Sequence, residues 1–230
     1  MSEYFLDVVQ PLLPVAEYLR KKGYLAIECE SSNAESSVLP LKLAAIRAGF
    51  GWQGKNSLFI SKEYGSYLAL GGIITDAEFN YNNKQEINYC KQCEKCITAC
   101  PLEAIESPYN VNSNKCLSKL LQMKEFSKST QSVMENRIGD CEICQDVCPW
   151  NKKHIDNPLN TKLTEKFKSN VKKWEKRFYL PDLENLTKEK YESLFGELNT
   201  TVPFEIFKRN VKKANENRIK NSKNIVSISK

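Results

Sequence analysis

Four cysteines crowd into one short stretch near the middle of the chain. They follow the spacing Cys-x2-Cys-x2-Cys-x3-Cys and end on a proline: Cys90, Cys93, Cys96 and Cys100. A second, wider set also ends on Cys-Pro and comprises Cys116, Cys141, Cys144 and Cys148. Thiolates are ligands for iron and other soft metals, so this pattern indicates metal binding.

The spacing of the first run is that of bacterial ferredoxins with two [4Fe–4S] clusters, in which the fourth cysteine of a run binds the other cluster. Such crossed binding needs a second set, and the chain supplies it. The first cluster is predicted to be held by Cys90, Cys93, Cys96 and Cys148. The second is predicted to be held by Cys100, Cys116, Cys141 and Cys144. The alternative is two structural zinc ions, which three cysteines within seven residues fit poorly.

Two further residues could carry metal or thiol chemistry. Cys29 falls in a predicted strand and is interpreted as a small buried hydrophobe, with a reactive thiol as the alternative. His154 is the only histidine, so no histidine-rich metal site can form, and we expect it on the surface.

The composition is that of a soluble globular protein, with 230 residues, 41% hydrophobic and 27% charged. The longest apolar run is too short to span a membrane. The N-terminus carries acids where a secretion signal would carry lysines, so the predicted location is the cytoplasm. In that reducing compartment clustered cysteines are metal ligands rather than disulfides.

The predicted fold class is α+β, in three parts. Residues 1–85 are predicted to form a small α/β domain, residues 86–150 a ferredoxin-like domain with two [4Fe–4S] clusters, and residues 151–230 a basic helical segment. The expected helices are 4–23, 40–48, 97–106, 114–123, 162–178, 187–195 and 203–217. The expected strands are 24–30, 57–61 and 66–75, the last two as a hairpin or near-hairpin.

The positive charge lies at the C-terminal end of the chain. The net charge is +6, and residues 151–230 hold 19 lysines and arginines against 10 acids. Such a segment suits a polyanion such as tRNA, although a charged helix is often only a solvated face.

Residues 39–76, together with the two cysteine sets and the Cys-Pro-Trp-Asn at 148–151, resemble the epoxyqueuosine reductase family. The cluster domain of that family is similar to that of reductive dehalogenases. The resemblance implies a cobalamin-dependent reductase that converts epoxyqueuosine to queuosine in tRNA, with electrons from an external ferredoxin or flavodoxin. It identifies a short member lacking most of the N-terminal cobalamin-binding half, so that residues 1–85 are a remnant and a second chain could supply the rest.

The resemblance also carries two site expectations. Glu35 matches the position of the family's aspartate and is expected to be the proton donor, unless it is a solvated loop acid. Gly54, Lys55, Asn56 and Ser57 are expected to contact cobalamin, although the family commonly has Gly-Lys-His here. The alternative for this loop is a structural turn with Trp52 in the core.

Two other functions remain open. One is a stand-alone electron carrier with two clusters and no corrin or tRNA role. The other is a reductase or partner of another corrinoid protein. Binding to tRNA that weakens with salt would favour the enzyme over the carrier.

Overall fold

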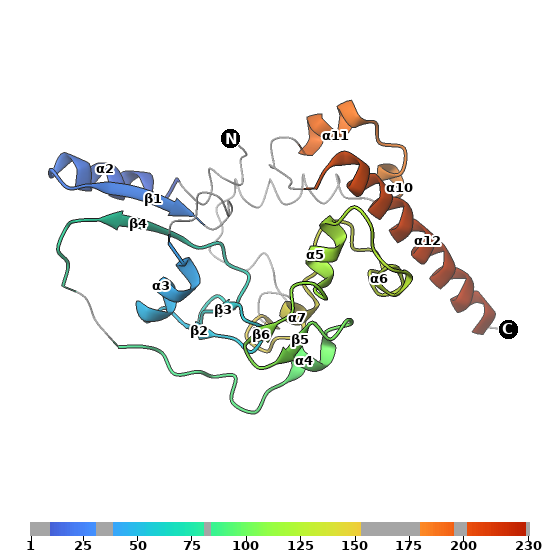
Figure 1. Ribbon diagram of the computed structural model, residues 1–230, viewed down its shortest axis with the longest axis horizontal. Helices are drawn as coiled ribbons and strands as arrows, with labels where there is room; N and C mark the ends of the chain where they lie inside the picture. The colour runs from blue at the N-terminus through green and yellow to red at the C-terminus, as the bar shows by residue number, and fades with distance from the viewer. Residues whose placement is uncertain (1–9, 31–38, 81–83, 153–179, 196–201, 229–230) are drawn as a thin grey trace.

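The chain forms three neighbouring groups of helices and strands, with the cysteine-rich segment in the middle (Figure 1). This computed structural model describes residues 10–30, 39–80, 84–152, 180–195 and 202–228. The expected mixture of helices and strands is confirmed. Within these ranges no helix is both long and apolar enough to cross a bilayer. Three predictions, the roles of Glu35 and His154 and the helix at 162–178, fall outside the described residues.

The N-terminal group consists of a helix packed on a two-stranded sheet. Helix α2 (Leu13–Lys21) has Pro14 in its first turn, where no backbone N–H partner is needed, so the helix begins there. Strand β1 (Ala26–Glu30) pairs antiparallel with β4 (Gly71–Thr75), and α2 packs against β1. Helix α3 (Leu41–Arg47) follows β1 along the chain. The predicted first strand and second helix are confirmed.

A second small sheet lies next to α3. Strand β3 (Phe59–Ile60) pairs with β2 (Trp52–Gln53), whereas β4 pairs with β1. The predicted hairpin pairing of residues 57–61 with 66–75 is therefore wrong, and an isolated antiparallel bridge between Ser61 and Gly65 closes the turn instead. The reason is the approach of β3 at Gly51, where an added Cβ would lie 2.0 Å from a carbonyl oxygen of β3. Only glycine permits this contact between the two strands.

The cysteine-rich segment consists of short helices around one small hairpin. Its elements are α4 (Lys95–Ala99), β5 (Ile105–Ser107), β6 (Asn110–Val111), α5 (Leu117–Gln122), α6 (Lys128–Val133) and α7 (Ile143–Asp146). Helix α4 packs against α7 and beside β5. The predicted helix at 114–123 contains α5 and is confirmed. The helix predicted at 97–106 stops early, because the chain turns extended at Cys100 and then enters β5.

The C-terminal group has its own apolar core. It consists of α10 (Leu180–Leu183), α11 (Lys188–Phe195) and the long helix α12 (Phe204–Ile228). The buried core residues are Leu183, Leu186, Tyr191, Val202, Phe207 and Val211. The helices predicted at 187–195 and 203–217 are confirmed, and α12 continues beyond the predicted end.

Two side chains fasten α12 to the cysteine-rich segment. Arg209 donates to the carbonyl oxygens of Met123, at 2.7 Å, and of Lys124. Asn210 is fully buried, and its amide donates to the carbonyl oxygens of Leu121 and Ile138, both at 2.8 Å. The Asn210 contacts satisfy backbone carbonyls away from solvent, and together with those of Arg209 they fix the position of α12.

Candidate metal centre

Two cavities lie inside the cysteine-rich segment, and each is lined by four cysteines. The first has a volume of about 310 Å³, and its cysteines are Cys90, Cys93, Cys96 and Cys148. The second has a volume of about 360 Å³, and its cysteines are Cys100, Cys116, Cys141 and Cys144. All eight are free thiols of intermediate exposure. The structure thus brings together the members of each predicted ligand set.

Tight turns and the short helix α4 position the first run of thiols. The Cys93 N–H donates to the Cys90 carbonyl at 2.8 Å, and Lys91 between them adopts a left-handed φ of 44°. Cys96 lies within α4, and Cys100 ends that helix with an extended backbone. The change of direction at Cys100 carries its thiol away from the first cavity and into the second.

The second run returns in the opposite sense. Cys116 stands directly before α5, where it is the N-cap, and Cys144 lies within α7. Cys148 follows α7 and lines the first cavity. Because α4 packs against α7, the last cysteine of each run lies at the cavity formed by the other run.

Burial makes several of these thiols hard to ionise. Desolvation raises the pKa of the Cys96 and Cys148 thiols, and the neighbouring thiolate of Cys90 raises both further. Desolvation also raises the pKa of Cys141, and it raises that of Cys144 to about 12. Four thiolates around one cavity repel one another, so they need positive charge among them. A metal centre supplies that charge and thereby keeps its thiol ligands deprotonated.

The cavities fit an iron–sulfur cluster better than a zinc ion. Zinc lies about 2.3 Å from each sulfur, so the four thiols of a zinc site meet around a single atom. Here the two sets surround about 310 and 360 Å³. Within the described ranges, no three or more His, Cys, Asp or Glu side chains are arranged to hold a single metal ion. Thiol ligands spread around a larger volume are the donor set of a [4Fe–4S] cluster.

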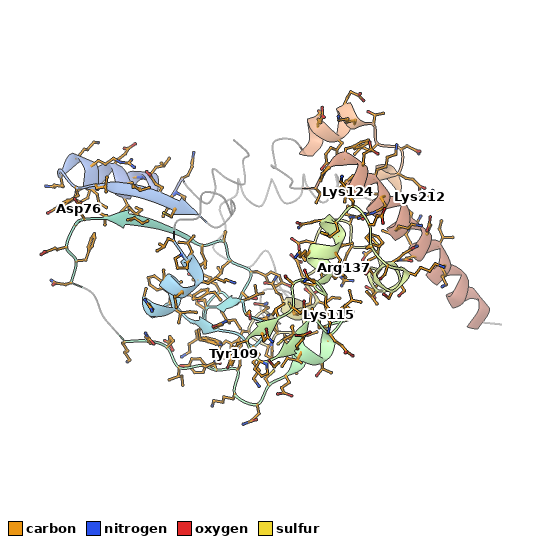
Figure 2. All side chains as sticks on the ribbon, viewed as in Figure 1. Asp76, Tyr109, Lys115, Lys124, Arg137 and Lys212 are labelled. Atoms are coloured by element: carbon orange, nitrogen blue, oxygen red, sulfur yellow. The ribbon has the colours of Figure 1, made fainter. Side chains whose placement is uncertain are left out.

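The turn Gly54–Ser57, expected to contact cobalamin, lies against the cysteine cavities. Lys55 lines the first cavity, Ser57 lines the second, and Asn56 lines both. The Tyr109 N–H donates to the Lys55 carbonyl at 2.9 Å, and the Ser57 hydroxyl donates to the Tyr109 carbonyl at 2.7 Å. Tyr109 marks this junction with the β5–β6 hairpin in Figure 2. The contact with cobalamin stays a prediction.

An aromatic cluster stands beside the first cavity. The rings of Trp52, Tyr89 and Trp150 lie with their centroids 4.9 to 5.5 Å apart. Trp52 is only 2% exposed, which agrees with the interpretation of this loop as a structural turn with Trp52 in the core. Tyr89 and Trp150 also line the cavity, so they give its wall an apolar surface.

The sequence did not reveal the role of Asn151, the last residue of Cys-Pro-Trp-Asn. Asn151 is fully buried, and its side chain hydrogen bonds with Ser66 and with the backbone of Gln145. It therefore joins the α/β part to the cysteine-rich segment. The only signal in the sequence was its place at the end of Cys-Pro-Trp-Asn.

The cysteine-rich segment matches a known family of metal-binding domains. A family model described as "4Fe-4S double cluster binding domain" matches residues 89–151. The chain is therefore an iron–sulfur protein whose cysteine-rich segment is a domain for two [4Fe–4S] clusters.

The chain is, more closely, a relative of the epoxyqueuosine reductases. It is 42% identical over 110 residues to that of Cyclobacterium marinum, covering 47% of this chain and 36% of the relative. It is 39% identical over 163 residues to that of Prochlorococcus marinus, covering 67% of this chain and 49% of the relative. The resemblance seen in the sequence is confirmed, and the chain spans half or less of the length of these relatives.

Solved structures agree on the fold. The structure of epoxyqueuosine reductase from Streptococcus thermophilus matches with a TM-score of 0.73 and 29% identity, covering 94% of this chain and 55% of that one. A crystal structure of epoxyqueuosine reductase with an epoxyqueuosine-modified tRNA-Tyr stem loop matches with a TM-score of 0.72 and 24% identity, covering 93% and 55%.

Proposed function

We propose that the chain is the electron-transferring part of an oxidoreductase of the epoxyqueuosine reductase type. The observation that carries this proposal is the pair of adjoining four-thiol cavities. Each [4Fe–4S] cluster, when bound, takes up and releases one electron, so two neighbouring clusters make a path for single electrons. The electrons would come from an external low-potential donor, a ferredoxin or flavodoxin.

We propose the crossed ligand sets for the two clusters. One set is Cys90, Cys93, Cys96 and Cys148, and the other is Cys100, Cys116, Cys141 and Cys144. The grouping of the thiols around the two cavities supports this assignment. Residues 86–150 would be the ferredoxin-like domain, residues 1–85 the α/β part, and residues 151–230 the basic segment.

The chain's own residues perform three tasks in this account. The eight thiols hold the iron. Apolar and aromatic side chains such as Ile60 and Trp150 form part of the wall of the first cavity. The turn Gly54–Ser57 closes both cavities from the side of the α/β part. Apolar surface next to a cluster limits the access of water and so affects its reduction potential.

Cobalamin is proposed as the acceptor of the electrons. Its binding half would include the α/β part, which exposes large apolar side chains on α2, β1 and the α3 region, among them Tyr18, Leu25, Ile27, Leu43 and Phe50. A two-stranded sheet with such a face is marginal alone, so the face suits packing against further polypeptide, such as a second chain. Glu35 is proposed to supply the proton to the departing epoxide oxygen, on the strength of its family position alone.

The proposed substrate carrier is tRNA. The described part of the C-terminal segment exposes Lys208 and Lys212 on α12, and Arg209 holds this helix beside the exposed Lys124. Lys124 and Lys212 are marked in Figure 2. Neighbouring lysines of this kind bind phosphates in a manner that weakens as salt is added.

A turnover assay tests the proposed function. The protein is loaded anaerobically with iron, sulfide and cobalamin, then given a reductant and an epoxyqueuosine-modified tRNA stem loop. Mass spectrometry should detect queuosine, and Glu35→Gln should abolish the product while leaving the iron content unchanged. A protein that holds both clusters but retains no corrin on gel filtration and forms no product would instead be an electron carrier.

A further inference from the structure

One short turn inserts between the two thiol cavities from outside the cysteine-rich segment. Of all the described residues, Asn56 alone lines both cavities, and its neighbour Lys55 lines the first. The two residues are 6% and 8% exposed. A buried lysine and a buried amide at this position require polar partners, since leaving such groups unpaired is costly.

Lys55 has an incomplete ion pair. Its ammonium nitrogen lies 3.6 Å from the Glu94 carboxylate, and the Glu94 side chain is 62% exposed while that of Lys55 is 9% exposed. A solvated carboxylate at that distance compensates only part of the desolvation of a buried charge. The first cavity offers the remaining partner, because four thiolates around an iron–sulfur core leave a net negative charge.

The side chain of Asn56 contacts a cysteine of the second cavity. Its side-chain amide donates to the Cys144 carbonyl at 3.5 Å. The side-chain oxygen of Asn56 accepts a hydrogen bond from the Leu58 N–H at 3.3 Å, which fixes the orientation of the amide. The donor end therefore points toward the backbone of Cys144, one of the four cysteines of the second cavity.

Reduction adds one negative charge to a cluster, so nearby positive charge and hydrogen-bond donors favour the reduced form and raise the reduction potential. We propose that Lys55 and Asn56 set the reduction potentials of the two clusters, Lys55 chiefly for the cluster held by the first cavity and Asn56 for the second. The electron comes from the low-potential donor of the proposed function, on which this inference rests, and no bond is made or broken. Both are positioning residues whose effect is electrostatic.

The test is a potentiometric titration of the loaded full-length protein, followed by EPR of the reduced clusters. The variant Lys55→Met keeps the length of the side chain but removes its charge. At the potential where the first cluster is half reduced in the parent protein, the variant should have a reduced-to-oxidised ratio at least tenfold lower, or about 59 mV for one electron. Asn56→Leu should lower the ratio for the second cluster instead.

The matched control is Lys95→Met. Lys95 lines the same cavity but is exposed, so solvent screens its charge and the ratio should change less than threefold. Lys55→Arg keeps the positive charge, so the reduction potential of the first cluster should stay close to that of the parent protein. If Lys55→Met loses iron, the uncharged Lys55→Gln is judged by the same criterion.

The outcomes separate this inference from the proposed function. Unchanged potentials in Lys55→Met and Asn56→Leu with full iron content would overturn the inference and leave the function intact. A parent protein that assembles no clusters would overturn both. Shifted potentials in a protein that forms no queuosine would support the inference and contradict the proposed substrate.

Discussion

The buried side chain of Asn151 holds the α/β part on the cysteine-rich segment, so its removal should weaken this junction. Its carbonyl oxygen accepts from the Ser66 N–H at 2.7 Å. Its amide donates to the Ser66 hydroxyl at 2.9 Å and to the Gln145 carbonyl at 2.8 Å. Asn151→Leu removes these three hydrogen bonds with little change in volume.

The size of the effect follows from what each partner retains. The buried Ser66 N–H loses the acceptor that Asn151 provides, which costs about 1–3 kcal/mol. The Ser66 hydroxyl keeps Gln145 Oε1, and the Gln145 carbonyl keeps the Cys148 N–H, so those two losses cost about 0.5–1 kcal/mol each. The total is about 3 kcal/mol. At a urea dependence of about 2–3 kcal/mol per molar, the midpoint should fall by about 1–1.5 M.

The assay is anaerobic urea unfolding of the loaded protein, followed by visible absorbance and far-UV circular dichroism. Asn185→Leu is the control, because Asn185 is exposed. The free energy of unfolding of this variant should change by less than about 0.5 kcal/mol. Equal midpoints for Asn151→Leu and the parent protein would refute the role of this contact.

Three further predictions concern stability. Gly65 has a φ of 70°, and a Cβ there would lie 2.1 Å from Asn151 Oδ1, so Gly65→Ala should destabilise by at least about 2 kcal/mol in the same urea titration. Gly23 has a φ of 90°, but an added Cβ there would meet no atom within 4 Å, so Gly23→Ala should lower the free energy of unfolding by only about 1 kcal/mol. Equal losses of stability in the two variants would refute the clash at Gly65. Tyr191→Phe removes a buried 2.6 Å hydrogen bond to the Val202 carbonyl and should cost about 1–2 kcal/mol in thermal unfolding; an unchanged midpoint would contradict this. Stripping the iron with a chelator should bleach the visible absorbance while the helical signal of α10 to α12 persists, because their core is apolar; loss of both signals together would show that this core depends on iron.

The grouping of the cysteines around two cavities could be predicted because much of its information is local. Cys90 to Cys100 lie within eleven residues. Their spacing predicts that the first three cysteines hold one cluster and the fourth holds the other. The helices of the C-terminal part were likewise predictable from their apolar period. Such features depend on neighbours in the chain, not on distant contacts.

The remaining features depend on contacts between distant parts of the chain. Strand β1 pairs with β4, with partners 41 to 49 positions apart, and nothing in either strand's own sequence selects that partner. Asn56 meets Cys144 across 88 positions, and Ser66 meets Asn151 across 85. The family position of Asn56 predicts a cobalamin contact, and its place at both thiol cavities could not be read from the sequence.

The measurement that tests the account most directly is a comparison of single cysteine variants by iron analysis and by Mössbauer or EPR spectroscopy. The parent protein should hold about eight irons, and each variant about four. Cys100→Ser should lose the same spectral component as Cys116→Ser, and Cys148→Ser the same component as Cys93→Ser. If Cys100→Ser instead matched Cys93→Ser, or if the protein bound zinc and no iron, the crossed two-cluster account would be contradicted.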